Sequence, residues 1–162
     1  SLAVAHIQRM VHDPSMVRPS VDGEPAPEFS LPSIDADAQL AAPVSLSQFR
    51  GKIVVVDFWA TWCGPCLDAL PHLAKVSQAD DTVVLAVNVD DPAEARKLVD
   101  LEPAGMQLLF DAEQAVAQRY GVVAFPHTAV VGPDGTVVRT LRGFAPHQLE
   151  RAIADARTRL SK

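Results

Sequence analysis

A run of apolar, mostly β-branched residues between positions 52 and 59 limits most strongly how this chain can fold. Residues 53–56 are Ile-Val-Val-Val, and Phe58 and Trp59 follow after a single acidic residue, Asp57. A strand with large apolar side chains on both faces must be covered on both sides, as the inner strands of parallel sheets are. We therefore predict a central strand over residues 52–59.

The rest of the chain alternates predicted helices with predicted strands. We expect helices over residues 66–78, 92–101, 112–120 and 146–160, and further strands over residues 82–89, 106–110, 128–131 and 136–141. Residues 132–135, Gly-Pro-Asp-Gly, join the last two strands into a hairpin. Asp111 is placed to cap the 112–120 helix, which we expect to be continuous. This order indicates an α/β fold with a mixed central sheet flanked by helices.

Two short extended pieces, residues 29–31 and 44–46, come before the central strand. With the turn-like residues 35–37 between them, they predict an N-terminal hairpin added to the main fold. We interpret residues 1–20 as a leader or flexible N-terminal segment. Residues 21–162 are predicted to form a single domain, because a chain of 162 residues is long enough for one core.

Charge and hydropathy exclude several broad classes of function. The chain carries 14 Lys and Arg against 20 Asp and Glu, a formal net charge of −6. General binding to nucleic acid or to an anionic membrane surface needs a basic patch, so neither is expected. No apolar run reaches the length of about 20 residues that spans a bilayer. We expect a monomer without a spanning segment.

The only two cysteines in the sequence, Cys63 and Cys66, follow the central strand as a Cys-x-x-Cys. Each of two thiols at this spacing can attack a mixed disulfide formed by the other, which suits two-electron thiol–disulfide exchange. A disulfide that closes so small a loop removes little entropy from the unfolded chain. The pair is therefore predicted to be reactive, with no cofactor beyond the Cys63–Cys66 disulfide.

The cysteine loop and its surroundings resemble a known family. Trp-Cys-Gly-Pro-Cys at residues 62–66, Asp-Phe-Trp-Ala at residues 57–60 and the isolated Pro126 resemble thioredoxin. The segments 46–52 and 23–31 are similar to the TlpA/ResA branch of thioredoxin-like proteins. The resemblance covers most of the chain and implies a thioredoxin fold with an N-terminal hairpin extension.

The resemblance also implies a function. Proteins of the TlpA/ResA branch are typically secreted or membrane-anchored in bacteria, and they reduce disulfides on specific partners. The identity of the partner stays open here, whether immature cytochrome c, a copper-site protein or something else. The implied partners are disulfide-bearing protein substrates and an upstream thiol reductant. An extracytoplasmic location in a bacterium, such as the periplasm, is expected, with a cytoplasmic location as the alternative.

Within the resemblance, Cys63 is the nucleophile and Cys66 the resolving thiol. The physical chemistry agrees, because a thiol just before a helix N-terminus has a lowered pKa and a larger thiolate fraction. Contacts with the substrate are assigned to residues around the cysteines: Trp62, Gly64, Pro65, Phe125 and Pro126. If a cis peptide bond precedes Pro126, as in the family, the backbone of Phe125 could pair with an extended substrate segment.

Two polar residues near the motif have two interpretations each. Asp57 matches the buried carboxylate of thioredoxins, and it is either the base that accepts the proton of Cys66 or a structural acid. Thioredoxins often supply a lysine on the next strand, and the matching residue here is Ala86. His127 stands where the family usually has threonine. It is either a neutral core residue or a group that approaches Cys63 and tunes its thiolate.

A further departure from the branch lies after the cysteines. ResA-like reductases often carry a glutamate three residues beyond the second cysteine, and this chain has Ala69 there with Asp68 beside it. Successive helix residues are rotated by about 100°, so Asp68 should face away from the matching position. The acid function of that branch is not predicted for Asp68.

Three alternative functions compete with a reductase. A thiol peroxidase needs a proline and a threonine seven and three residues before its reactive cysteine, where this chain has Val56 and Ala60. A zinc or copper module could use the two cysteines with His72 or His127, but one Cys-x-x-Cys is half of a typical ligand set. A disulfide oxidase or isomerase would use the same dithiol. Gly64-Pro65 is the pair found in thioredoxin, so reduction is the predicted direction.

Overall fold

The computed structural model describes residues 21–99 and 105–159, so the predicted leader at residues 1–20 lies outside the described residues. The strands are β1 (Ser30–Ile34), β2 (Leu40–Ser45), β3 (Ile53–Trp59), β4 (Thr82–Asn88), β5 (Met106–Phe110), β6 (His127–Val131) and β7 (Val137–Arg142). The helices are α2 (Gly64–Val76), α3 (Pro92–Leu98), α4 (Ala115–Arg119) and α5 (Pro146–Thr158), with 3₁₀ turns η2 (Leu46–Phe49) and η3 (Ala112–Gln114).

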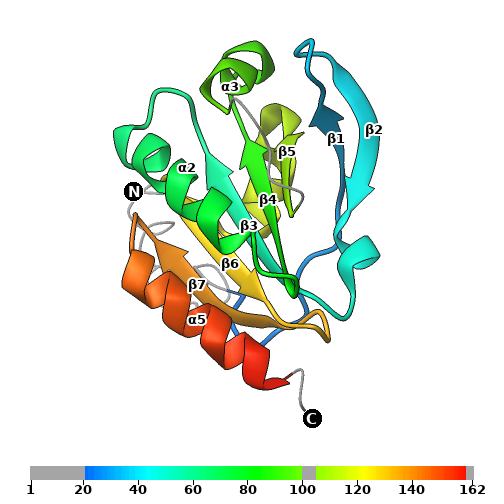
Figure 1. Cartoon of the computed structure of the whole chain (residues 1–162). Coiled ribbons are helices and arrows are strands. Elements are labelled where there is room, and N and C mark those ends of the chain that lie inside the picture. The colour runs from blue at the N-terminus through cyan, green and yellow to red at the C-terminus, as the bar shows by residue number, and fades with distance from the viewer. Residues whose placement is uncertain (1–20, 100–104, 160–162) are drawn as a thin grey trace, which may run out of the picture.

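The strands form one mixed sheet in the order β2-β1-β5-β4-β3-β6-β7 (Figure 1). β3, β4 and β5 run parallel, whereas β6 is antiparallel to β3 and β7 is antiparallel to β6. The β1–β2 hairpin pairs with β5 and extends the sheet at that side. The predicted mixed sheet with an N-terminal hairpin extension is confirmed.

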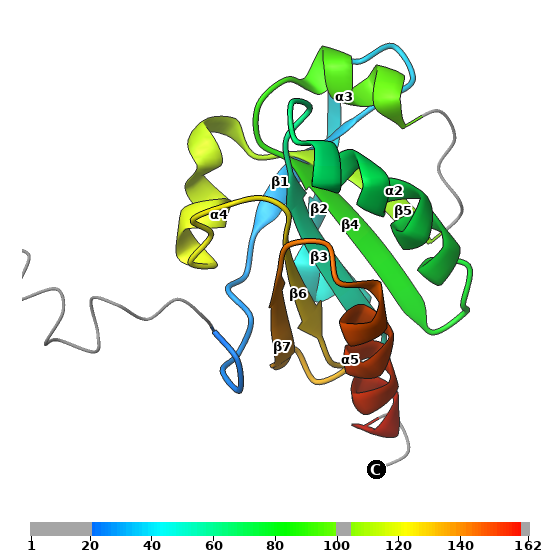
Figure 2. The same ribbon diagram turned by 90° about the vertical axis from the view of Figure 1, so that its left-hand side faces the viewer.

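The central strand is covered on both faces, as its sequence predicts. All seven residues of β3 are buried. Helices α2 and α5 lie on one face of the sheet and α4 lies on the other (Figure 2). Within the part of the chain that the structure describes, no helix is both long and apolar enough to cross a membrane.

The prediction of one continuous helix over residues 112–120 is wrong. Glu113 and Gln114 have φ values of 58° and 57°, in the left-handed region, so the chain turns and α4 begins only at Ala115. Asp111 still caps that helix, but from a distance: its carboxylate accepts the N–H groups of Val116 at 3.0 Å and Ala117 at 2.8 Å. These bonds satisfy two of the donors that the helix start leaves unpaired.

Candidate active site

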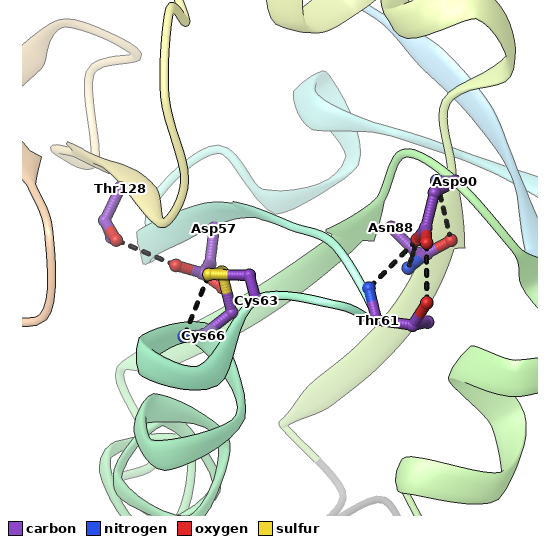
Figure 3. Close-up of a disulfide and its surroundings, with 7 residues drawn as sticks. All are labelled: Asp57, Thr61, Cys63, Cys66, Asn88, Asp90 and Thr128. Carbon is purple, nitrogen blue, oxygen red and sulfur yellow. Dashed lines mark hydrogen bonds between the residues drawn. A yellow bond between two sulfur atoms is a disulfide. The ribbon is translucent and has the colours of Figure 1, made fainter.

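A disulfide joins Cys63 and Cys66 at the start of α2, with Cα atoms 5.2 Å apart. Cys63 is the N-cap residue, and the helix begins at Gly64, two residues earlier than predicted. Pro65 fits in this first turn because its missing N–H would have no partner there. The N–H of Cys66 donates to Cys63 Sγ at 3.2 Å (Figure 3). The sulfur of Cys63 thus lies at the positive end of the helix, which stabilises a thiolate.

The two cysteines differ in accessibility. Cys63 is 5% exposed, whereas Cys66 is 0% exposed. A substrate sulfur can therefore reach Cys63 from outside, and Cys66 can act only on a bond that Cys63 has already formed. This asymmetry supports the assignment of Cys63 as nucleophile and Cys66 as resolving thiol.

The residues assigned to substrate contact lie around the disulfide. The Trp62 side chain is 71% exposed, and its ring meets that of Phe125 edge to face with centroids 6.0 Å apart. Gly64 and Pro65 are exposed in the first turn of α2. The Phe125–Pro126 peptide bond is cis, as the resemblance implies. Phe125 precedes β6, and among the described residues its backbone has no hydrogen-bond partner.

Asp57 lies buried in the middle of the sheet, on the face that α2 and α5 cover. It pairs in register with Thr128 of β6 and with Ala86 of β4. The Thr128 hydroxyl donates to Asp57 Oδ1 at 2.8 Å, whereas Oδ2 has no hydrogen-bond partner among the described residues (Figure 3). Burial raises the pKa of Asp57 from 3.8 to about 7, against a smaller opposing effect of the Thr128 hydrogen bond. A carboxyl group that titrates near neutral pH can accept and release a proton there.

A small cavity of about 20 Å³ adjoins Asp57 between the sheet and helices α2 and α5. This volume is enough for about one water molecule. Ala69, one turn after Cys66, lines the cavity, while Asp68 is exposed, as the helical offset predicts. The small Ala69 side chain therefore leaves room beside the buried carboxyl group.

His127 lies on the opposite face of the sheet from Asp57. It pairs in register with Phe58, and the two ring centroids are 6.2 Å apart. Burial, and to a lesser extent the charge of Arg142, lowers the pKa of His127 to about 4. The imidazole is therefore neutral at neutral pH, which supports the interpretation as a core residue.

A hydrogen-bonded cluster that the sequence analysis missed holds the loop before Cys63. Asp90 Oδ1 accepts the N–H of Thr61 at 3.0 Å and the Nδ2 group of Asn88 at 2.9 Å, and Oδ2 accepts the Thr61 hydroxyl at 2.5 Å (Figure 3). The signal was available, because β3 and β4 are parallel and the residues after them emerge at the same edge of the sheet. The parallel pairing could therefore have predicted that polar residues after the two strands meet.

The comparisons with known proteins agree with this geometry. The model of the AhpC/TSA family matches residues 23–140. The chain belongs to the AhpC/TSA family. Thioredoxin-like protein YneN of Bacillus subtilis is 30% identical over 122 residues, 72% of this chain and 68% of YneN. Thiol-disulfide oxidoreductase ResA of Geobacillus thermodenitrificans is 29% identical over 125 residues, 75% of this chain and 69% of ResA.

A solved structure gives the same answer for the fold. The crystal structure of a protein assigned as thiol:disulfide interchange protein DsbE, from Chlorobium tepidum, matches with a TM-score of 0.73 and 32% identity. The match covers 85% of this chain and 98% of that one. The predicted resemblance to thioredoxin-like proteins of the ResA type is confirmed. This AhpC/TSA family member is a thiol–disulfide oxidoreductase with a thioredoxin fold.

The structure also bears on two of the alternative functions, the thiol peroxidase and the metal-binding module. Val56 and Ala60, at the positions where a thiol peroxidase needs proline and threonine, are fully buried. No three His, Cys, Asp or Glu side chains that could hold a metal ion lie together in residues 21–99 and 105–159. Cys63 and Cys66 are bonded to each other, and His127 lies across the sheet from Asp57.

Proposed function

We propose that this protein reduces disulfides in partner proteins outside the bacterial cytoplasm, as a monomer reset by an upstream thiol reductant. The observation that carries the proposal is the arrangement of the dithiol, with one sulfur at the surface end of α2 and the other fully buried behind it. The ResA and DsbE relatives support the location and the class of substrate. The Cys63–Cys66 pair is the only redox group that the proposal needs.

The first step takes place at Cys63, the more accessible of the two cysteines. The Cys63 thiolate attacks one sulfur of the substrate disulfide, so that a mixed disulfide forms and the other substrate sulfur leaves as a thiolate. The helix N-terminus and the Cys66 N–H, 3.2 Å from Cys63 Sγ, stabilise the attacking thiolate. The leaving thiolate takes its proton from solvent.

The second step takes place inside the protein. The Cys66 thiol gives its proton to the Asp57 carboxylate, and the Cys66 thiolate attacks Cys63 Sγ. The Cys63–Cys66 disulfide forms as the bond to the substrate breaks, and two electrons have passed from the protein dithiol to the substrate. Asp57 suits the role of base because its pKa of about 7 lies near the working pH.

The surface around Cys63 fits an extended segment with apolar side chains. Trp62 and Phe125 form one apolar contact at the disulfide, and Val123, two residues before Phe125, is 82% exposed. The backbone groups of Phe125 can form hydrogen bonds with an extended substrate segment, which would then pair as an added β-strand. Gly64 and Pro65 present no bulky side chain that would block the approach to Cys63.

The redox equilibrium of the dithiol with glutathione tests the direction. We expect a reduction potential near that of thioredoxin, about −270 mV. A potential above about −180 mV, in the range of disulfide isomerase, would overturn reduction and favour the oxidase or isomerase. A Cys66→Ser variant should trap its partners as mixed disulfides on Cys63, and a Cys63→Ser variant is the matched control that should trap none. Cell fractionation tests the location.

A further inference from the structure

A second titratable group, His72, lines the cavity beside Asp57. His72 lies in α2, one turn after Ala69, and both line this cavity together with Asp57. The ring of Phe144 packs edge-on against the imidazole with centroids 6.3 Å apart, and Phe144 also lines the cavity. The imidazole is therefore held in the wall between α2 and the segment that leads into α5.

A second hollow lies on the other side of this imidazole. It is a groove of about 240 Å³ between α2 and α5, lined in part by His72, Lys75, Glu150 and Arg157. His72 is the one described residue that lines both the inner cavity and the outer groove. Its side chain is 19% exposed, and Nε2 lies 3.8 Å from Glu150 Oε1. The imidazole thus stands between the buried carboxyl group and an acidic group at the surface.

The mechanism of the second step leaves a proton on a buried group. Asp57 is only 1% exposed, so a proton received from Cys66 lies on a carboxyl group that has almost no contact with bulk solvent. Ala86, the neighbour of Asp57 on β4, has no group that could carry it away. The cavity, with room for about one water molecule, is the space that adjoins the carboxyl group.

We propose that His72 is the relay through which Asp57 exchanges its proton with solvent in each catalytic cycle. The inference rests on the proposed function, because it assigns the proton path of the same dithiol. A water in the cavity passes the proton of Asp57 to one ring nitrogen, and the other nitrogen releases it toward Glu150 and the groove. The path runs in reverse when the disulfide is reduced again, so protons and electrons balance over the cycle.

The charged groups around His72 come from three elements. Asp57 faces it from β3 across the cavity, Lys75 lies on its own helix, and Glu150 and Arg157 line the groove from α5. Arg157 is engaged with Asp81, with Nε 2.6 Å from Asp81 Oδ2. Glu150 is therefore the acidic group placed to attract a proton outward from the imidazole.

The test follows the two steps of exchange separately. Reduced protein is mixed with an aromatic disulfide whose thiolate absorbs light: the first release reports the attack by Cys63, and the second reports the resolution by Cys66. In His72→Gln the second release should be about tenfold slower at pH 6, where most Asp57 is protonated and must first lose its proton through the relay, while the first release is unchanged. The slowing should stay below the roughly 10²-fold typical of a group that acts directly on the reacting atom.

Two further variants separate a relay from a structural role. His147→Gln, a change of the same type at an exposed histidine of α5, should release both thiolates at the wild-type rate. His72→Ala should also be slow in the second release, and imidazole added to the solution should restore its rate. A wild-type second release in His72→Gln, or a slow His72→Ala that imidazole does not restore, would overturn the relay. Absence of the first release in the unmodified protein would instead overturn the proposed function.

Discussion

Asp57 and His127 are two buried titratable residues on adjacent central strands, one register step apart and on opposite faces of the sheet. Burial acts on both in the same sense, since it favours the uncharged form: it raises the pKa of Asp57 to about 7 and lowers that of His127 to about 4. Their surroundings differ. Asp57 adjoins a cavity beside the first turns of α2, whereas His127 packs against Phe58, which in turn contacts Tyr120.

A shifted pKa alone therefore does not make a buried group functional. A proton can be used only where it can reach a reacting atom and later leave. Asp57 shares its face with the dithiol helix and with a space that can hold a water molecule. His127 shares its face with aromatic rings, so its neutral form serves the packing of the core.

The pH dependence of folding should separate the two residues most clearly. The raised pKa of Asp57 contributes stability that is present below pH 3.8 and is lost as the pH rises through about 7, about 4 kcal/mol in all. The lowered pKa of His127 contributes stability that is present above pH 6.5 and is lost as the pH falls through about 4, about 3 kcal/mol. In the unmodified protein the two slopes oppose each other between pH 4 and 6.5.

Urea unfolding of the oxidised protein from pH 4 to pH 7 checks this balance. In Asp57→Asn the free energy of unfolding should rise with pH, and in His127→Thr it should fall with pH. Asp81 and Asp134 have lowered pKa values and act mainly below this range, so they leave the comparison intact. The same slope in both variants would show that one of the two groups is not desolvated as described.

The rate of the second thiolate release, which reports the attack by Cys66, should also distinguish Asp57 from His127. In Asp57→Asn the second thiolate release should slow by about 10²-fold at pH 7, because the base for Cys66 is removed while the size of the side chain is kept. In His127→Thr both releases should stay within about twofold of the unmodified rate, and the pKa of Cys63 should not move. Stopped-flow absorbance measures both. An unchanged rate in Asp57→Asn would show that Asp57 is a structural acid and not the base for Cys66.

Much of this site could be predicted from sequence because it follows from local patterns. The apolar run at residues 53–59 predicted the buried central strand, and the Cys63–Cys66 spacing predicted the dithiol at the start of a helix. The position of Asp57 one residue before Phe58 already placed the two side chains on opposite faces, because side chains alternate along a strand.

The parts that were missed depend on how distant segments meet. The sequence gives no sign that Glu113 and Gln114 adopt left-handed conformations and so delay the start of α4. The bond between Asp90 and Thr61 joins the ends of two strands that are about 30 residues apart in the sequence. His72 looked like a possible metal ligand, and only the packing of α5 against α2 shows that it lines the cavity of Asp57.

Removal of the Thr128 hydroxyl should have a smaller effect, and this effect should be on the pKa of Asp57 alone. The hydroxyl donates to Asp57 Oδ1 at 2.8 Å and favours the carboxylate. Thr128→Val keeps the shape and removes this bond, so the pKa of Asp57 should rise by about one unit, since a hydrogen bond to a charged group contributes about 1.5 kcal/mol or more. The pH at which the second thiolate release reaches half its maximal rate should move up equally. Thr128→Ser keeps the hydroxyl and should leave that pH in place.

The smallest effect should come from Tyr120, on the side of His127. Its hydroxyl donates to the carbonyl of Pro27 at 2.7 Å, and its ring lies 5.3 Å from that of Phe58. Tyr120→Phe should lower the free energy of unfolding by about 1 kcal/mol, the typical net contribution of one hydrogen bond, and should change neither thiolate release. Urea unfolding and stopped-flow absorbance on the same sample test both halves. A slower second release would mean that the aromatic residues on the His127 face affect the reaction of Cys66. It would contradict the proposal that only the Asp57 face takes part in the exchange.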